Sequence, residues 1–194
     1  MTEKAEGYLI GIDVGTGSAR AGVFTATGRM VGTDKCAIAI HREGGVIVEQ
    51  SGEDIWQAVV RAVRGAVADA GVAPEQVRGI GVDATCSLVV LGADREPLPV
   101  GDPSHPERNV IVWMDHRAVD QAERINTIGH RVLDYVGGRI SPEMETPKLL
   151  WLKENRPDVY ARAWQFMDLT DFLTWRATGD LSRSICTVTC KWTY

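Results

Sequence analysis

The sequence predicts an α/β domain built on a mixed β-sheet, and three observations lead to this class. Two apolar runs flank a short glycine-rich segment near the N-terminus, as in a β-hairpin, and a third extended stretch follows. A long amphipathic pattern comes next, with Ser51 as its N-cap and Gly71 beyond its end. A further strand and several helical stretches complete the chain. This order of strands and helices is typical of a mixed sheet with an N-terminal β-meander and flanking helices.

Each expected element rests on a local pattern. The run at 77–84 is almost continuously apolar, which predicts a central, buried strand. Prolines mark residues 92–108 as a surface loop, and the last fifteen residues have no clear pattern. Strands are expected at 8–10, 21–24, 30–40, 46–50, 77–84, 87–91 and 110–113, and helices at 51–70, 117–136, 146–156, 157–164 and 168–177.

Composition excludes several classes of function. The 194 residues are 44% hydrophobic and 24% charged, as in an ordinary soluble protein, with a net charge of −5 and no basic cluster. We therefore expect neither a nucleic-acid partner nor a membrane partner. The polar start lacks a signal-peptide core, so a cytoplasmic location is expected. The four cysteines are scattered, which disfavours a zinc site or a disulfide framework and favours buried, reduced thiols.

The first candidate site is the glycine-rich turn of the N-terminal hairpin. Glycines there can take positive φ, and successive free N–H groups can form a nest for an anion. Hydroxyl groups add donors, and Asp13 at the strand end could hold Mg²⁺ directly or through water. The alternative is a plain turn in which Gly and Ser serve only the chain reversal. The candidate phosphate-binding residues are Asp13, Gly15, Thr16, Gly17, Ser18 and Arg20.

Two further candidates follow apolar strands. Asp83, Ala84 and Thr85 stand at the carboxyl end of the strand 77–84, where ligands gather in open α/β sheets, although a satisfied strand end is the alternative. Asp115 could accept hydroxyl groups of a sugar, but it could equally cap the helix expected from Arg117.

Two isolated charges complete the set of candidates. Lys191 stands between Cys190 and Trp192, and a partly buried lysine usually has an anionic or polyhydroxyl partner. Its stem could also simply lie along the surface. Glu143 lies in a loop before a helix, and it reads more readily as a helix-start acid than as a catalytic group.

Taken together, the motifs resemble the FGGY carbohydrate kinases. The segment 11–20, Gly-Ile-Asp-Val-Gly-Thr-Gly-Ser-Ala-Arg, is similar to the first phosphate motif of that family. The segments 83–88, 113–118, 147–155 and 190–194 resemble its pentulose-kinase branch, in the family's order and over essentially the whole chain. The resemblance implies an actin-like, ribonuclease-H-like domain, in agreement with a phosphate-binding hairpin turn on a mixed sheet. It also implies ATP and Mg²⁺ as cofactors and a pentulose, D-ribulose or similar, as substrate.

The resemblance assigns roles and sets limits on them. It implies sugar contacts at Ala84, Thr85 and Lys191, with Asp83, Asp115 and Glu143 as weaker assignments. Family members are much longer, and their catalytic base is an aspartate that would lie beyond Tyr194. We therefore expect residues 1–194 to form only an N-terminal, sugar-binding domain. Alone it should lack kinase activity, since its partner, a C-terminal kinase lobe, is missing.

Two alternatives remain open at this stage. One is an actin-like ATP-binding module without sugar chemistry, and the other is a non-catalytic short isoform or pseudokinase that binds a sugar or a partner. The oligomeric state is also open, with a homodimer as one alternative.

Overall fold

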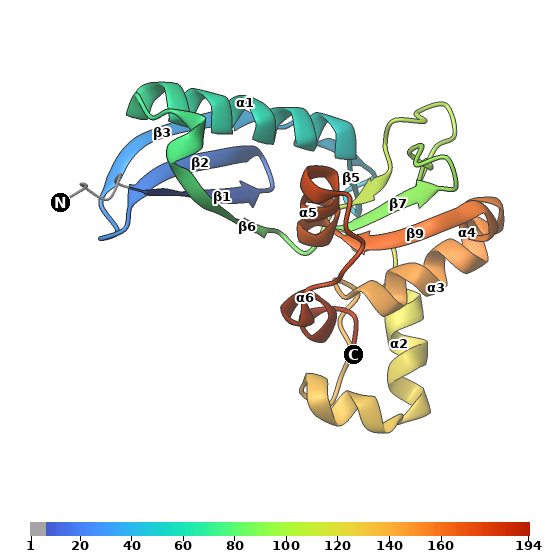
Figure 1. The fold of residues 1–194 in the computed structure, drawn as a ribbon. Coiled ribbons are helices and arrows are strands. Elements are labelled where there is room, and N and C mark those ends of the chain that lie inside the picture. Colours follow the sequence, from blue (N-terminus) through green and yellow to red (C-terminus); the bar gives the residue numbers. More distant parts are fainter. Residues whose placement is uncertain (1–6) are drawn as a thin grey trace. The chain divides into compact units, whose positions relative to one another are not determined.

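The computed structural model describes residues 7–194 (Figure 1). The chain divides into two compact units. Unit 1 comprises the chain up to Ala39 together with Glu53–Thr85, and unit 2 comprises Ile40–Gly52 and Cys86–Tyr194.

Unit 1 is built on a four-stranded mixed sheet. Its strand order is β3-β2-β1-β6, in which β1, β2 and β3 form an antiparallel meander and β6 runs parallel to β1. The N-terminal meander and the mixed sheet predicted from the sequence are thereby confirmed. The strands are β1 (Tyr8–Gly15), β2 (Ser18–Thr25), β3 (Met30–Ala37) and β6 (Val77–Ala84).

Helix α1 (Gly52–Ala70) covers one face of this sheet (Figure 1). Alternate residues of β1 are buried, as the two-residue period of a strand requires, and most of β2 and the apolar stripe of the helix are buried as well. Gly71, with φ of +62°, ends the helix as predicted, and a short 3₁₀ turn (Pro74–Gln76) leads into β6. The buried residues are Ile10, Ile12, Val14, Ala19, Ala21, Val23, Ile55, Ala58, Val59, Ala62 and Ala66.

Strand β6 corrects one prediction. Its apolar sequence predicted a central position, but among the described residues it forms the edge of the sheet, and Ile80 is 58% exposed. A run of apolar residues shows that a strand avoids water but does not show which neighbours cover it, so this position could not be derived from the pattern.

Unit 2 contains a second sheet, which is antiparallel throughout and was not foreseen. Its strand order is β4-β5-β8-β7-β9. Strand β9 occupies residues expected partly as helix, because its pairing with β7 along Leu88–Gly92 overrides the local preference. The strands are β4 (His41–Glu43), β5 (Ile47–Gln50), β7 (Leu88–Gly92), β8 (Val110–Ile111) and β9 (Ala163–Asp168).

The helices of unit 2 follow the sequence signals with two exceptions, a break in the stretch 117–136 and a helix at 185–190 that was not foreseen. The stretch 117–136 was expected as one helix, but Gly129, with φ of +64°, ends α2 early, and a 3₁₀ turn (Arg131–Val136) follows. Asp168 caps α5 as predicted, since its carboxylate accepts the Thr170 N–H at 3.1 Å. The α-helices are α2 (Val119–Ile128), α3 (Glu145–Asn155), α4 (Pro157–Arg162), α5 (Leu169–Thr178) and α6 (Ile185–Cys190).

The cysteines are less buried than expected. All four are free thiols, but Cys36 and Cys86 are only half-buried, and Cys186 and Cys190 are exposed. Over residues 7–194, the helices are all too short or too polar to cross a bilayer.

Candidate functional site

The hairpin between β1 and β2 reverses the chain at Thr16 and Gly17, with Gly15 paired to Ser18. The expected positive φ is wrong for both glycines of this turn, since neither belongs to the residues with positive φ. Gly15 has a different steric role. A Cβ atom there would lie 2.9 Å from Nη2 of Arg20, so the absence of a side chain lets the guanidinium lie against the backbone.

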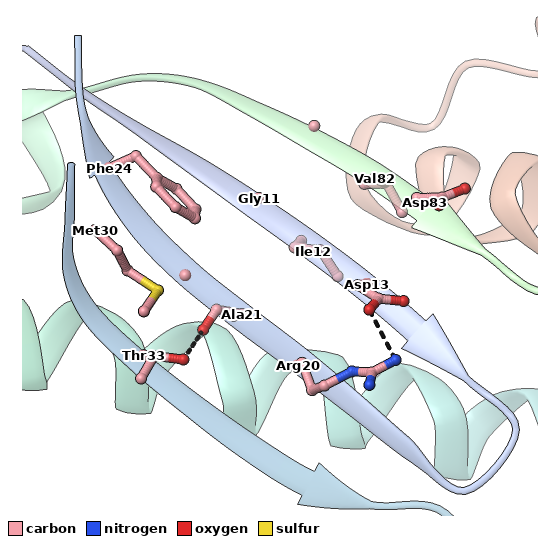
Figure 2. A pocket seen from close by; sticks show the side chains of 12 residues that line it. Gly11, Ile12, Asp13, Arg20, Ala21, Phe24, Met30, Thr33, Val82 and Asp83 are labelled. Carbon is pink, nitrogen blue, oxygen red and sulfur yellow. Dashed lines mark hydrogen bonds and ion pairs between the residues drawn. The ribbon is translucent and has the colours of Figure 1, made fainter. Parts of the chain in front are cut away.

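The carboxylate of Asp13 faces that guanidinium on the sheet face opposite α1. Asp13 Oδ2 and Arg20 Nη2 are 2.7 Å apart, and both side chains are about half exposed. Asp83 of β6 stands beside Asp13, as its register partner on the parallel neighbour (Figure 2). The three charged side chains line one end of an open hollow of about 540 Å³, whose floor includes Gly11 and Gly81. This end of the hollow is polar and accessible.

The residues that follow Asp83 are placed by backbone hydrogen bonds. The Ala84 N–H donates to Asp83 Oδ1 at 3.0 Å, and the Thr85 N–H donates to the Val14 carbonyl at 3.0 Å. Ala84 and Thr85 are half-buried. Strands β1 and β6 of unit 1 therefore bring the predicted phosphate turn and the predicted strand-end residues to the same end of the sheet, where both strands finish.

The carboxylates of Asp13 and Asp83 suit a metal ion that is also coordinated by a bound ligand. Among the described residues, no group of three or more His, Cys, Asp or Glu side chains could hold a metal ion. Mg²⁺ commonly binds through one or two carboxylates, waters and the phosphates of a nucleotide. Asp13, with Asp83 beside it, fits that mode and does not fit a site made of protein ligands alone.

In unit 2, Asp115 holds the core together. It is fully buried and accepts hydrogen bonds from the Val48 N–H at 2.6 Å and from Nε and Nη2 of Arg117 at 2.9 and 2.8 Å. Arg117 also bonds Glu49 at 2.8 Å and lies 5.0 Å above the ring of Trp151. The helix that Asp115 might have capped begins only at Val119. Both carboxylate oxygens are thus bonded within the protein, which gives Asp115 a positioning role.

A second buried ion pair was not singled out from the sequence. Glu145 and Lys148, in the first turn of α3, are both fully buried, with Oε1 and Nζ 3.7 Å apart. That separation exceeds a normal hydrogen bond, and neither group has a hydrogen-bond partner among the described residues. Glu145 resembled an ordinary helix-start acid, and Lys148 carried no signal beyond its apolar neighbours. Buried polar atoms without partners usually bind water or a ligand.

Predicted site residues surround this pair. Lys148 interacts electrostatically with Asp115, Glu143 and Lys191 as well as with Glu145. The backbone carbonyl of Lys191 accepts the Glu145 N–H at 3.0 Å, which ties the end of the chain to the start of α3. Glu143 is half-buried and lies 3.2 Å from Nε2 of His116. The three candidates of unit 2 therefore lie around one buried pair.

Burial dominates the protonation of this region. It raises the pKa of Glu145 to about 8, against the opposing charge of Lys148, and it lowers the pKa of Lys148 despite the nearby carboxylates. Burial likewise raises the pKa of Asp168, at the end of β9, to about 6. Carboxyl groups with raised pKa values are found in binding and catalytic sites more often than elsewhere.

The raised pKa of Glu145 predicts a pH-dependent stability. Between pH 4.5, the ordinary pKa of a glutamic acid side chain, and about pH 8, Glu145 is protonated in the folded state but ionised in the unfolded state. The stabilisation from this group is therefore complete below pH 4.5 and is lost as the pH rises through about 8. Urea unfolding at pH 5 and pH 8 should show the wild type losing about 3 kcal/mol more than Glu145→Gln. Glu123→Gln, an exposed control, should follow the wild type. Equal losses in Glu145→Gln and the wild type would contradict the buried titration.

Comparison with known proteins places the chain in a family. Residues 8–190 match the model of the N-terminal domain of the FGGY family of carbohydrate kinases. The chain belongs to this family.

Several relatives are considerably longer. The chain is 48% identical over 193 residues to a human FGGY carbohydrate kinase domain-containing protein, covering 99% of this chain and 35% of that protein. It is 46% identical over 186 residues to D-ribulokinase of Saccharomyces cerevisiae, covering 95% of this chain and 26% of that enzyme. The chain thus spans about a third or less of the length of these relatives.

Solved structures support the fold. A gluconate kinase from Lactobacillus acidophilus matches with a TM-score of 0.77 at 23% identity, over 91% of this chain and 34% of that one. A xylulose kinase from Brucella ovis matches with a TM-score of 0.74 at 22% identity, over 87% and 34%. The actin-like α/β fold expected from the sequence is confirmed.

Proposed function

We propose that the chain is the sugar-binding lobe of an ATP-dependent pentulose kinase, with D-ribulose or a similar pentulose as the phosphate acceptor. The observation that carries the sugar assignment is the placement of Lys191 and Glu143 around the buried and unpartnered pair Glu145–Lys148. A polyol offers several hydroxyl groups that both donate and accept hydrogen bonds, which suits such a mixture of cationic and carboxyl groups. The D-ribulokinase relative favours a pentulose.

The phosphate half of the proposal rests on unit 1. The backbone N–H groups of the turn at Thr16 and Gly17, together with the Arg20 guanidinium, suit the phosphates of ATP. Asp13 would hold the Mg²⁺ that accompanies the nucleotide, with Asp83 beside it. Bound Mg²⁺ would neutralise charge on the transferred phosphoryl group. Arg20 bonds an oxygen of Asp13 in the present structure, so we expect this ion pair to open when metal and phosphate bind.

The chain's own part in the reaction is to bind and orient the sugar. Lys191 would donate to a sugar hydroxyl, and Glu143 would accept from one, while Asp115 holds Arg117 and the strands around it in place. The sugar contacts expected at Ala84 and Thr85, which belong to unit 1, stay a prediction. The proton acceptor for the reacting hydroxyl is proposed to come from the C-terminal lobe of the complete kinase, so the 194-residue chain should bind sugar without phosphorylating it.

A lysine substitution tests the sugar site. Lys191→Ala should weaken D-ribulose binding about tenfold or more, because a hydrogen bond from a charged donor contributes about 1.5–3 kcal/mol. Calorimetric titration of the chain with D-ribulose, and separately with Mg-ATP, measures both affinities. Lys153→Ala, which removes an exposed lysine of the same unit, should leave both unchanged. Weakened ATP binding with unaltered sugar binding would remove Lys191 from the sugar site.

A further inference from the structure

A buried carboxylate joins two helices of unit 2. Asp171, in the first turn of α5, is only 3% exposed. Its Oδ2 accepts the Thr187 hydroxyl at 2.7 Å, and its Oδ1 accepts the Ser184 N–H at 3.0 Å. Ser184 is the N-cap of α6, and Thr187 is the buried residue of that helix. Both oxygens of one carboxylate therefore hold the start of α6 on α5, and these two hydrogen bonds are called the Asp171 anchor below.

The chain that leaves α6 is attached to the start of α3. The Lys191 carbonyl accepts the Glu145 N–H at 3.0 Å, and the hydroxyl oxygens of Thr146 and Thr193 lie 3.3 Å apart. The ring of Trp192 packs against the apolar cluster formed by β7, β8, α3 and α4. The segment that carries Lys191 is thus held at both ends, by α5 before it and by α3 beside it.

Thr193 adopts a backbone conformation that a threonine rarely takes. Its φ of +58° lies in the left-handed region, which is unfavourable for a β-branched residue. Such a conformation persists where the surrounding contacts determine it. The Tyr194 N–H donates to the Val188 carbonyl at 3.1 Å and turns the chain back onto α6. The position of Lys191 is therefore set by contacts with its neighbours and not by the local preference of the chain.

We propose that Asp171 is a positioning residue that holds Lys191 at the proposed sugar site through Thr187 and α6. This inference rests on the proposed function, because the role of Lys191 is taken from it. The Lys191 N–H donates to the Thr187 carbonyl at 3.4 Å, so the anchored residue and the lysine are one helical turn apart. A backbone that is fixed before the sugar arrives leaves less ordering to be done on binding.

Loss of the Asp171 anchor would lower the fraction of molecules in which Lys191 is in place. The apparent dissociation constant of a ligand equals the intrinsic constant divided by the fraction of protein that is competent to bind. A competent fraction of about one tenth would therefore weaken D-ribulose binding about tenfold. The same loosening should expose the backbone amides of residues 184–193 to exchange with solvent.

Thr187→Val tests the anchor, because valine keeps the shape of the side chain and removes the hydroxyl donor. Hydrogen–deuterium exchange of residues 184–193 should become about tenfold faster, and calorimetric titration of the 194-residue chain should show about tenfold weaker D-ribulose binding. Thr189→Val is the matched control on the same helix. Its exposed hydroxyl donates to the Ile185 and Cys186 carbonyls within α6, so both readouts should stay unchanged. Equal exchange in the two variants would overturn the anchor.

Two substitutions of Asp171 itself keep the test decisive if Thr187→Val does not fold. In Asp171→Asn, the amide can still accept the Ser184 N–H and can donate to the Thr187 hydroxyl oxygen. Asp171→Asn should therefore bind D-ribulose within about threefold of the wild type, whereas Asp171→Ala should bind about tenfold more weakly. Equal affinities of the asparagine and alanine variants would overturn an anchor made of hydrogen bonds.

A combined variant separates positioning of Lys191 from a general effect on stability. If Asp171 acts through Lys191, adding Thr187→Val to Lys191→Ala should weaken D-ribulose binding no further, whereas independent effects would add. Additive losses would overturn the positioning role. If the wild type bound no D-ribulose, or if Lys191→Ala left its affinity unchanged, the proposed function and the positioning role would both fail. The exchange comparison of Thr187→Val with Thr189→Val would still decide on the anchor.

Discussion

Replacing Arg117 by methionine is expected to lower the free energy of unfolding by about 3–5 kcal/mol. The guanidinium is only 2% exposed and bonds two carboxylates that are themselves buried, those of Asp115 and Glu49. Methionine retains much of the side-chain volume but leaves both carboxylates without their cation, and an uncompensated buried charge is strongly destabilising. The loss is a large part of the 5–15 kcal/mol that stabilises a typical domain. Urea denaturation followed by circular dichroism measures it.

An exposed ion pair of the same unit supplies the control for this prediction. Arg124 contacts Glu154 at 2.6 Å, but its side chain is 57% exposed. Exposed pairs contribute about 0–1 kcal/mol, so Arg124→Met should change the free energy of unfolding only slightly. If Arg117→Met were no more destabilising than Arg124→Met, the network around Asp115 would not be the structural centre described here. Asp115 would then be free for another role.

The second large effect is expected at Gly32, on β3. A Cβ atom there would lie 2.5 Å from both the Ala66 carbonyl oxygen and the Ala70 nitrogen, which are backbone atoms of α1. Helix and sheet would have to move apart over the core of unit 1, because backbone atoms cannot turn aside as a side chain can. Gly32→Ala is therefore expected to destabilise the chain by about 3 kcal/mol, measured in the same urea experiment.

The control for Gly32 is a glycine with open space around it. A Cβ atom at Gly81, on β6, meets no atom within 4 Å, and Gly81 has no positive φ. Gly81→Ala should therefore change stability by less than about 0.5 kcal/mol. A Gly32→Ala variant as stable as Gly81→Ala would mean that α1 does not pack against β3 as closely as the structure shows.

The sequence predicted those parts of the fold that local signals determine. The meander and α1 were correct because strand alternation, the N-cap position and Gly71 act within a few residues. The edge position of β6 and the strand β9 were missed. Both depend on which distant segments pair, and that information does not lie in a short window.

For the candidate site, the sequence predicted which residues take part better than it predicted which partners their side chains contact. Asp13 and Asp83 were found as strand-end acids, and the structure places them side by side because β1 and β6 run parallel in register. Asp115 was found too, but its full burial against Arg117 depends on the pairing of β5 with β8, which no local motif predicts although both strands were expected. Glu145 and Lys148 were missed as a pair, since an acid and a lysine in the first turn of a helix usually face solvent.

A coupled kinase assay tests the central claim most directly. The longest protein product that contains this chain is supplied with Mg-ATP and a panel of pentuloses, with glycerol and gluconate as comparison substrates, and ADP formation is followed. We predict turnover with D-ribulose or a closely similar pentulose, loss of turnover in Asp13→Ala, and no turnover by residues 1–194 alone. Failure of the longest product to phosphorylate any pentulose would contradict the proposed substrate class. Turnover by residues 1–194 alone would contradict the proposal that the proton acceptor lies in another lobe.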